Sequence, residues 1–480
     1  MSAIRGTWEG SARGGIGPAA VLGVAVAVGV LAGVNPTLGV AAAAGLVFGL
    51  LVLWNLTLGL CLFLLVTFLD VVSRNQNLSL TKGAGAVLAG SWLAVILSQR
   101  GARRDFSAQQ PWLMAALVAF LAWNLMSVLW AQSPAAMLRS TERYALDALL
   151  VPIVFWAVRD RRHVVWIFGV FVVGALLSVL WGLTQGKVGG GAAAAQVGRL
   201  SGANVEANVL ATLLVVCTVF SSALVLILRQ APVARTLALL AALGAMAAFF
   251  GTFSRGGLVS LGVVILVGCV YAGRARPAFV ALVLVAAVVG AFFLGNDTSR
   301  TVQRLTSTST SGRSDIWKVG LRMVRANPVI GVGSGNYTVV ERDYLLTEPG
   351  SIKRGDLIVT TPLPAHNIYL HVLAEMGIIG LVLFLSILWL SIRSAVKAVR
   401  VFRDTGQQSL EILGRSLVVA LVGILAADFF VSDQYSKQLW VLLALGPALL
   451  AIARRPGSSS APARGRGRRS AAVSPVAPQL

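Results

Sequence analysis

Long, unbroken apolar runs constrain the fold of this chain more than any other feature of its sequence. A membrane-spanning helix needs about 20 apolar residues, with a tolerance of roughly 17–25, and many of the runs approach that length. Of the 480 residues, 57% are hydrophobic and only 12% are charged, and the mean hydropathy is +0.81. This composition excludes a water-soluble globule. The sequence therefore predicts an all-α polytopic integral membrane protein with about 12–14 transmembrane helices.

One polar interruption divides the candidate membrane spans into two groups. Eleven candidate spans precede the interruption and three follow it. The fourteen candidates lie near residues 17–34, 37–54, 57–72, 84–98, 111–130, 144–158, 164–184, 207–228, 235–252, 258–272, 277–295, 377–393, 413–431 and 437–453. Arg5 and Arg13 precede the first run, and a second run follows it almost directly, so we expect an uncleaved first span rather than a signal peptide.

The distribution of Lys and Arg predicts the orientation of the chain. With a cytoplasmic N-terminus, 23 of the 40 basic residues fall in cytoplasmic segments and eight fall in short outer loops, as the positive-inside rule requires. The basic residues behind the net charge of +22 are then expected to interact with anionic membrane lipids, and we expect no nucleic-acid partner. The predicted organisation is a cytoplasmic segment at 1–16, a transmembrane bundle at 17–295, an extracytoplasmic loop with amphipathic helices at 296–376, C-terminal transmembrane helices at 377–453 and a disordered basic cytoplasmic tail at 454–480.

A basic amphipathic helix is predicted inside the extracytoplasmic loop, between Asp315 and Asn327. One face of this helix carries the basic residues Lys318, Arg322 and Arg325. The opposite face carries the apolar residues Ile316, Val319 and Met323. A basic helical face is usually a solvated surface, and substrate binding by this face is the alternative.

Several polar residues fall on the predicted outer side of the membrane, where the positive-inside rule disfavours arginine. Arg255 lies in a Ser-Arg-Gly-Gly connection so short that the arginine is held at the outer interface. Arg199 and Asn208 lie near the start of an earlier helix, and His366 and His371 close the long loop. A histidine with a pKa near 6.5 can accept a proton at ambient pH. Structural alternatives remain, because an arginine can snorkel at a helix end and an interfacial histidine can be purely structural.

The inventory of titratable residues favours an anionic substrate handled without a metal ion. The sequence contains no Asp-x-Asp motif and no His and Cys cluster with zinc-ligand spacing, so we expect no metal and no cofactor. Arginine stays charged at any relevant pH and binds phosphate oxygens through two parallel hydrogen bonds. The outer arginines are therefore candidate ligands for a phosphate-bearing substrate.

Five short motifs resemble those of one family of membrane enzymes. They are Gly198–Gly202, Ser254–Gly257, Gly312–Arg313 with Trp317, Pro328–Gly333, and His366–Asn367. The last motif is the most specific, because nine residues separate its asparagine from a Gly-x-x-Gly pair at Gly377 and Gly380. Over residues 196–382 the succession resembles the bacterial O-antigen ligase and O-antigen polymerase superfamily of membrane glycosyltransferases.

The resemblance implies a GT-C-type helical fold and metal-independent, inverting transfer of a glycan at the outer face of the inner (plasma) membrane. The implied donor is a glycan on undecaprenyl diphosphate, and the implied acceptor is a lipid or glycan hydroxyl such as that of lipid A-core. Carried over by position, Arg255 and Arg313 would bind the diphosphate and His366 would be the general base. Further diphosphate candidates are Arg199, Arg322 and Arg325, and the supporting residues are Asn208, Asn367, Tyr369 and His371.

Two reactions fit this resemblance, since a ligase and a polymerase would share the donor and the outer loop. The His-Asn motif favours the ligase. Transfer to protein is less favoured, because nothing resembling an extra soluble domain follows the last span. From another class, an anion-selective transporter would be expected to show an inverted repeat and paired discontinuous helices, and neither is evident in the sequence.

Overall fold

The computed structural model of the chain describes residues 26, 29–30, 32–69, 80–98, 105–184, 199–202, 206–273, 276–296, 313–347 and 362–455. In this part of the chain every regular element is a helix and none is a strand. Six of these helices are long and apolar enough to cross a membrane, and five shorter apolar helices accompany them. The predicted all-α polytopic membrane fold is therefore confirmed, whereas a total of about 12–14 spans stays a prediction.

The described helices begin a few residues earlier than most of the predicted spans. The first turns of these helices contain charged or polar residues, which lie outside the apolar runs. In chain order they are α2 (Pro36–Trp54), α3 (Leu56–Phe68), α4 (Leu80–Ser98), α5 (Phe106–Gln109), α6 (Pro111–Met126), the 3₁₀ turn η2 (Ser127–Leu129), α7 (Pro134–Ala157), α8 (Arg161–Thr184), α9 (Ala207–Ile227), α10 (Pro232–Gly251), α11 (Arg255–Tyr271), α12 (Arg276–Asn296), α14 (Arg313–Ala326), α15 (Tyr337–Leu346), α17 (Ile368–Asp404), α18 (Gln408–Ala427) and α19 (Lys437–Ala453).

Several predictions concern segments outside the described residues. They are the cytoplasmic segment 1–16, the tail from residue 456 onward, Gly198 and Gly312 of the family-like motifs, and residues 297–312 and 348–361 of the long loop. The predicted domain boundaries at 16, 295, 376 and 453 stay predictions.

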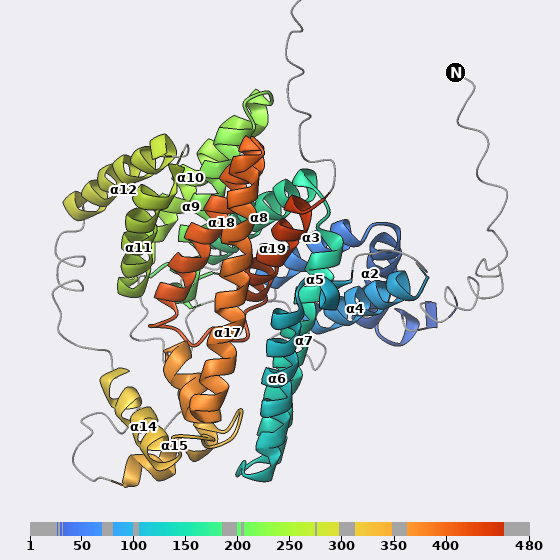
Figure 1. Cartoon of the computed structure of the whole chain (residues 1–480), viewed down its shortest axis with the longest axis vertical. Coiled ribbons are helices and arrows are strands. Elements are labelled where there is room, and N and C mark those ends of the chain that lie inside the picture. The colour runs from blue at the N-terminus through green and yellow to red at the C-terminus, as the bar shows by residue number, and fades with distance from the viewer. Residues whose placement is uncertain are drawn as a thin grey trace, which may run out of the picture.

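The helices form one bundle with a small group of helices at one end. Within the bundle, α19 packs against α7 and α17, and α18 packs against α9, α11 and α17. Almost every residue of α19 and most residues of α9 are buried, so these two helices lie in the interior of the bundle. In Figure 1, α14 and α15 lie together at the lower end, and α6 and α7 reach toward the same end. The predicted extracytoplasmic helices therefore gather at one end of the molecule.

The structure lengthens the sixth predicted span into α7, which begins ten residues before residue 144. Ser133 caps the helix, since its hydroxyl accepts a hydrogen bond from the backbone N–H of Ala136 at 3.3 Å, and Pro134 occupies the first turn. The first turns carry Arg139, Glu142 and Arg143, so they lack the apolar signal on which the prediction relied. A segment predicted as an outer loop is thus helical.

The two glycines of the family-like motif allow a sharp break inside α17. Gly377 has φ +64° and ψ −170°, which is non-helical, and divides α17 into a short first part and a long second part. A Cβ atom at Gly377 would collide with the carbonyl of Val329, and one at Gly380 would collide with Met376. Only glycine fits the left-handed turn at Gly377 against a neighbouring backbone, and Gly380 leaves room for the Met376 side chain. The break coincides with the predicted start of a membrane span at residue 377.

The helices α14 and α15 share a small apolar core with the first part of α17. Its buried residues include Ile316, Val319 and Met323, as the amphipathic pattern predicts. Arg322 lies on the predicted basic face but is not solvated, because it is only 7% exposed, and its role as a diphosphate ligand stays a prediction. Its guanidinium Nη1 donates to the backbone carbonyls of Tyr344 at 2.8 Å and Leu345 at 3.1 Å. Arg322 is buried because the carbonyls at the C-terminal end of α15 need a donor.

Candidate active site

His366 lies immediately before α17 in a strained backbone conformation. Its φ of +49° falls in the left-handed region, which costs an ordinary residue about 1–3 kcal/mol and is common at functional sites. The next residue, Asn367, is the N-cap of α17, and its Oδ1 accepts hydrogen bonds from the N–H groups of Tyr369 at 2.9 Å and Leu370 at 3.0 Å. The His-Asn motif thus combines a histidine in an unusual backbone conformation with an asparagine that caps the start of the helix.

The connection between α18 and α19, residues 428–436, holds the His366 segment in place. The carbonyl of Asp428 accepts a hydrogen bond from the N–H of Ile368 at 2.9 Å, and the hydroxyl of Ser432 accepts one from the N–H of Asn367 at 3.3 Å. The start of α11 packs on the same connection, because a Cβ atom at Gly256 would lie 3.1 Å from Cβ of Phe430. Arg255, the residue before this glycine, therefore lies at the same connection as His366.

The start of α14 also meets this place through Trp317. The indole Nε1 of Trp317 donates to the carbonyl of Ala365 at 2.9 Å, next to His366. The same indole packs edge-on against Phe429, with 5.7 Å between ring centroids. Arg313 lies one helical turn before Trp317, so α14 carries its arginine toward the histidine.

Electrostatic interactions link these residues directly. Burial lowers the pKa of Arg313, the nearby Glu206 raises this pKa, and Arg255 lowers it. Arginine remains charged despite such shifts. Arg313 thus interacts electrostatically with both Arg255 and Glu206, so two positive charges from different helices lie close together.

The pKa of His366 is lowered from its usual value of 6.5, chiefly because burial disfavours the charged imidazolium. Glu206 acts in the opposite direction and raises this pKa, whereas Arg313 and His371 lower it. A histidine with a lowered pKa is neutral at neutral pH, and a neutral imidazole can accept a proton. The site therefore combines a base with two fixed cations.

Arg199 and Asn208 hold the turn that precedes Arg255. The guanidinium of Arg199 donates from Nε to the carbonyl of Thr252 at 2.8 Å and from Nη2 to Oδ1 of Asn208 at 2.9 Å. The same oxygen accepts a hydrogen bond from the hydroxyl of Ser254, the N-cap of α11, at 2.9 Å. These contacts give Arg199 a positioning role, in addition to any contact with substrate.

The remaining predicted site residues lie around this centre. The phenol of Tyr369 donates to the carbonyl of Leu425 at 2.7 Å, which fastens α17 to α18. His371 is buried one turn further along α17 and stacks on Tyr337, with ring centroids 5.0 Å apart. Arg325 is exposed in the last turn of α14, where a cation complements the helix dipole. Arg322 caps α15, as described above.

Glu206 is the residue of this site that the sequence prediction missed. It directly precedes α9 and is exposed, and it influences the pKa of both Arg313 and His366. A signal was present in the sequence, because Glu206 is the only acidic residue in the connection between α8 and α9. A lone carboxylate beside predicted outer arginines therefore indicates a candidate site residue.

The fold and the site together define an all-α polytopic membrane protein with a histidine and two arginines gathered at one end of its bundle. Residues 237–385 match the family model described as O-antigen ligase, and Arg255, Arg313 and His366 all fall within the match. This match supports membership of the O-antigen ligase superfamily, as the motifs predict. No curated protein matches the chain. The family and the apolar helices indicate a multi-pass inner-membrane protein of the ligase or polymerase type, which acts in polysaccharide biosynthesis.

Proposed function

We propose that this protein is a glycosyltransferase of the O-antigen ligase type, acting at the outer face of the inner membrane. It moves a glycan from undecaprenyl diphosphate to the hydroxyl of a lipid-linked acceptor, such as lipid A-core or an analogous glycolipid. One observation carries the proposal: a half-buried, strained His366 lies where α11 and α14 deliver Arg255 and Arg313. A general base beside two fixed cations suits attack on a sugar whose leaving group is a diphosphate.

The reaction needs one proton acceptor and stabilisation of one anion. The acceptor oxygen attacks the anomeric carbon of the donor sugar and loses its proton to Nδ1 or Nε2 of His366. The bond between the anomeric carbon and the diphosphate oxygen breaks as the new glycosidic bond forms, so the configuration inverts. The diphosphate leaves as an anion, and Arg255 and Arg313 stabilise its developing charge. A stable diphosphate anion needs no general acid.

Reconstitution in liposomes tests the proposal. The wild-type protein, supplied with a synthetic lipid-diphosphate glycan and a glycolipid acceptor, is expected to form product in the presence of a chelator, and His366→Ala is expected to form almost none. His366→Asn is the better-matched variant, because asparagine tolerates a positive φ. Full activity in both folded variants would sink the assignment of the base.

The length of the product separates the two reactions of this family. A ligase adds a completed glycan once, whereas a polymerase extends carrier-linked repeat units and yields a ladder. We expect single addition with a glycolipid acceptor. A ladder formed from carrier-linked units alone would make the polymerase the correct assignment while leaving the roles of His366, Arg255 and Arg313 intact.

A further inference from the structure

A cavity of about 410 Å³ opens on the α7 side of the His366 segment. It is lined by α7, by residues 335–339, by the first part of α17 and by the connection between α18 and α19. Its volume lies within the roughly 300–1,000 Å³ typical of small-ligand sites. Pro364 and Ser432 both line the cavity, and Ser432 accepts the hydrogen bond from the N–H of Asn367. The cavity therefore adjoins the segment that carries the residue proposed as the base.

Two buried polar side chains in the cavity wall have atoms without a hydrogen-bond partner. His371 and Glu375 are 7% and 2% exposed at their side chains, and Nε2 of His371 lies 3.2 Å from Oε1 of Glu375. The same Oε1 accepts a hydrogen bond from the N–H of Tyr337 at 3.1 Å. Among the described residues, Nδ1 of His371 and Oε2 of Glu375 have no partner. Buried polar atoms are normally hydrogen-bonded, so two such atoms in one cavity indicate a ligand with hydroxyl donors.

Two arginines lie at the open side of the cavity. Arg139 and Arg143 are one turn apart on α7, and both are exposed. The guanidinium carbon of Arg143 lies 5.4 Å from the centroid of the Tyr435 ring, which holds this side chain over the cavity. Across residues 105–184 and the other described segments, neither arginine forms an ion pair. The cavity thus has cations at its mouth and hydrogen-bond acceptors at its floor.

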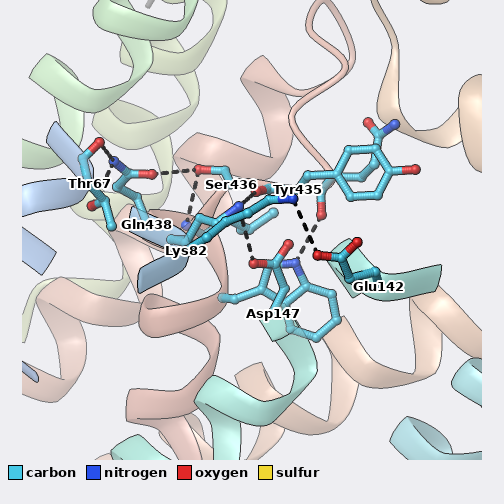
Figure 2. Close-up of polar contacts among 11 residues, drawn as sticks. Thr67, Lys82, Glu142, Asp147, Tyr435, Ser436 and Gln438 are labelled. Carbon is cyan, nitrogen blue, oxygen red and sulfur yellow. Dashed lines mark hydrogen bonds and ion pairs between the residues drawn. The ribbon is translucent and has the colours of Figure 1, made fainter. Parts of the chain in front are cut away.

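The cavity is built on a rigid frame. The hydroxyl of Ser140 lies 2.7 Å from those of both Ser334 and Tyr435, which joins α7 to two other walls. Figure 2 shows Glu142 and Asp147 of α7 facing Lys82 and the start of α19, where Lys437 lies 3.6 Å from Asp147. These contacts fix the helix that carries the two arginines, so the cavity does not have to form when a ligand arrives.

A turn with glycines at positions 331, 333 and 335 brings α7 close enough to form the cavity. Gly335 has φ +69°, and a Cβ atom there would lie 2.8 Å from Cβ of Ser140. At Gly333, with φ +101°, a Cβ atom would lie 2.7 Å from that of Ala131. These glycines therefore serve close packing of the turn against α7 and the segment before it.

We propose that this cavity binds the acceptor saccharide, and that Arg139 and Arg143 select acceptors carrying an anionic group, a phosphate or a carboxylate. Sugar hydroxyls donate to Nδ1 of His371 and Oε2 of Glu375, while the anionic group lies at the exposed arginines, away from the buried carboxylate. The inference rests on the proposed glycosyl transfer for the word acceptor.

Binding of small saccharides to the full-length protein in phosphatidylcholine nanodiscs tests the proposal. The probes are methyl glucoside 6-phosphate, methyl glucuronide and uncharged methyl glucoside, each titrated by calorimetry. We expect the two anionic probes to bind at least about tenfold more tightly than the uncharged one, the order of magnitude of a charge-assisted pair of hydrogen bonds. Arg139→Gln with Arg143→Gln is expected to remove this preference. An equal affinity for all probes, or an unchanged preference in the double variant, overturns the proposal.

A matched control is Arg161→Gln with Arg162→Gln, which removes two charges from the start of α8 and should leave the preference intact. Thermal unfolding of both double variants checks that the fold is retained. In nanodiscs containing phosphatidylglycerol, displacement of the sugar phosphate by lipid would show that the cavity holds a headgroup and would overturn the assignment to the acceptor.

Farnesyl diphosphate, a probe for the donor, separates this inference from the proposed function. The Arg139 and Arg143 double variant should bind farnesyl diphosphate as the wild type does, and loss of that binding would assign the cavity to the donor instead. If Arg255→Gln retains diphosphate binding while the double variant loses its preference for anionic sugars, the proposed donor site fails and the anionic saccharide site stands.

Discussion

Two arginine-bearing regions flank the start of α17, and they are built in different ways. In the first, Arg255 and Arg313 come from the starts of two helices far apart in sequence and meet at the half-buried His366. In the second, Arg139 and Arg143 come from one continuous helix and stand over the cavity lined by His371. The first region depends on tertiary packing to assemble, whereas the second needs only helical spacing to pair its charges.

The two histidines of α17 differ in the same way. His366 precedes the helix, adopts a positive φ and has a lowered pKa, so its imidazole is available as a base. His371 lies within the helix, between the Tyr337 ring and the Glu375 carboxylate. Only four residues therefore separate a histidine suited to proton transfer from one suited to holding a ligand.

The largest expected effect tests the difference between the two histidines. A general base contributes roughly 10²–10⁴-fold to a rate, so His366→Asn should lower kcat by that factor. His371→Asn should act mainly on KM for the acceptor, because His371 binds and does not transfer the proton. Steady-state kinetics in liposomes, with donor and acceptor varied separately, measure both. Similar losses of kcat in the two variants would contradict the division of roles.

The next largest effect tests the difference between the two pairs of arginines. Arg255→Gln with Arg313→Gln should weaken donor binding by about ten- to a hundredfold or more, since each hydrogen bond to a charged group is worth roughly 1.5–3 kcal/mol. Arg139→Gln with Arg143→Gln should instead raise KM for an anionic acceptor. Arg325→Gln, an exposed arginine at the end of α14, is the control and should change neither constant. If the Arg255 and Arg313 variant also raised KM for the acceptor, or the Arg139 and Arg143 variant also weakened donor binding, the two regions would form one site.

A structural effect of similar size concerns the break between the two parts of α17. Gly377→Ala places a Cβ atom against the Val329 carbonyl and forces a positive φ on alanine, so we expect a loss of about 1–3 kcal/mol in stability. The midpoint of thermal unfolding in detergent measures this loss. Gly406→Ala is a useful control, because Gly406 also has a positive φ, of +71°, but no atom lies within 4 Å of an added Cβ. Equal shifts in the two variants would show that the contact with Val329 contributes nothing.

The smallest effect sharpens the account of His366. The rate should be constant near neutral pH and should fall as the pH drops through the pKa of His366, which lies below 6.5, because the protonated imidazole cannot accept a proton. Glu206→Gln removes the charge that raises this pKa, so the acidic limb of kcat/KM should move to lower pH. A limb that stays in place or moves to higher pH would exclude the interaction between Glu206 and His366.

Much of the fold and part of the site could be predicted from the sequence. Apolar runs located most of the described helices, and the Gly-x-x-Gly motif marked the break at Gly377. The burial of Arg322 against α15 could not be predicted, because helical periodicity cannot show that a neighbouring helix end requires a buried donor. The prediction missed the first turns of α7, where charged residues interrupt the apolar signal. Burial of a charged side chain depends on what packs against it, and a pattern within one helix does not contain that partner.

The sequence by itself determined the membrane class, the approximate positions of the helices and the family-like motifs that contain Arg255, Arg313 and His366. Only the tertiary structure decided which polar residues share one place. The connection of residues 428–436, which carries none of these motifs, joins the start of α11 to the His366 segment through Phe430 and Asp428. The physical reason is that helix lengths follow from local hydrophobicity, whereas the meeting of side chains from distant helices follows from packing and hydrogen bonds between segments that sequence order keeps apart.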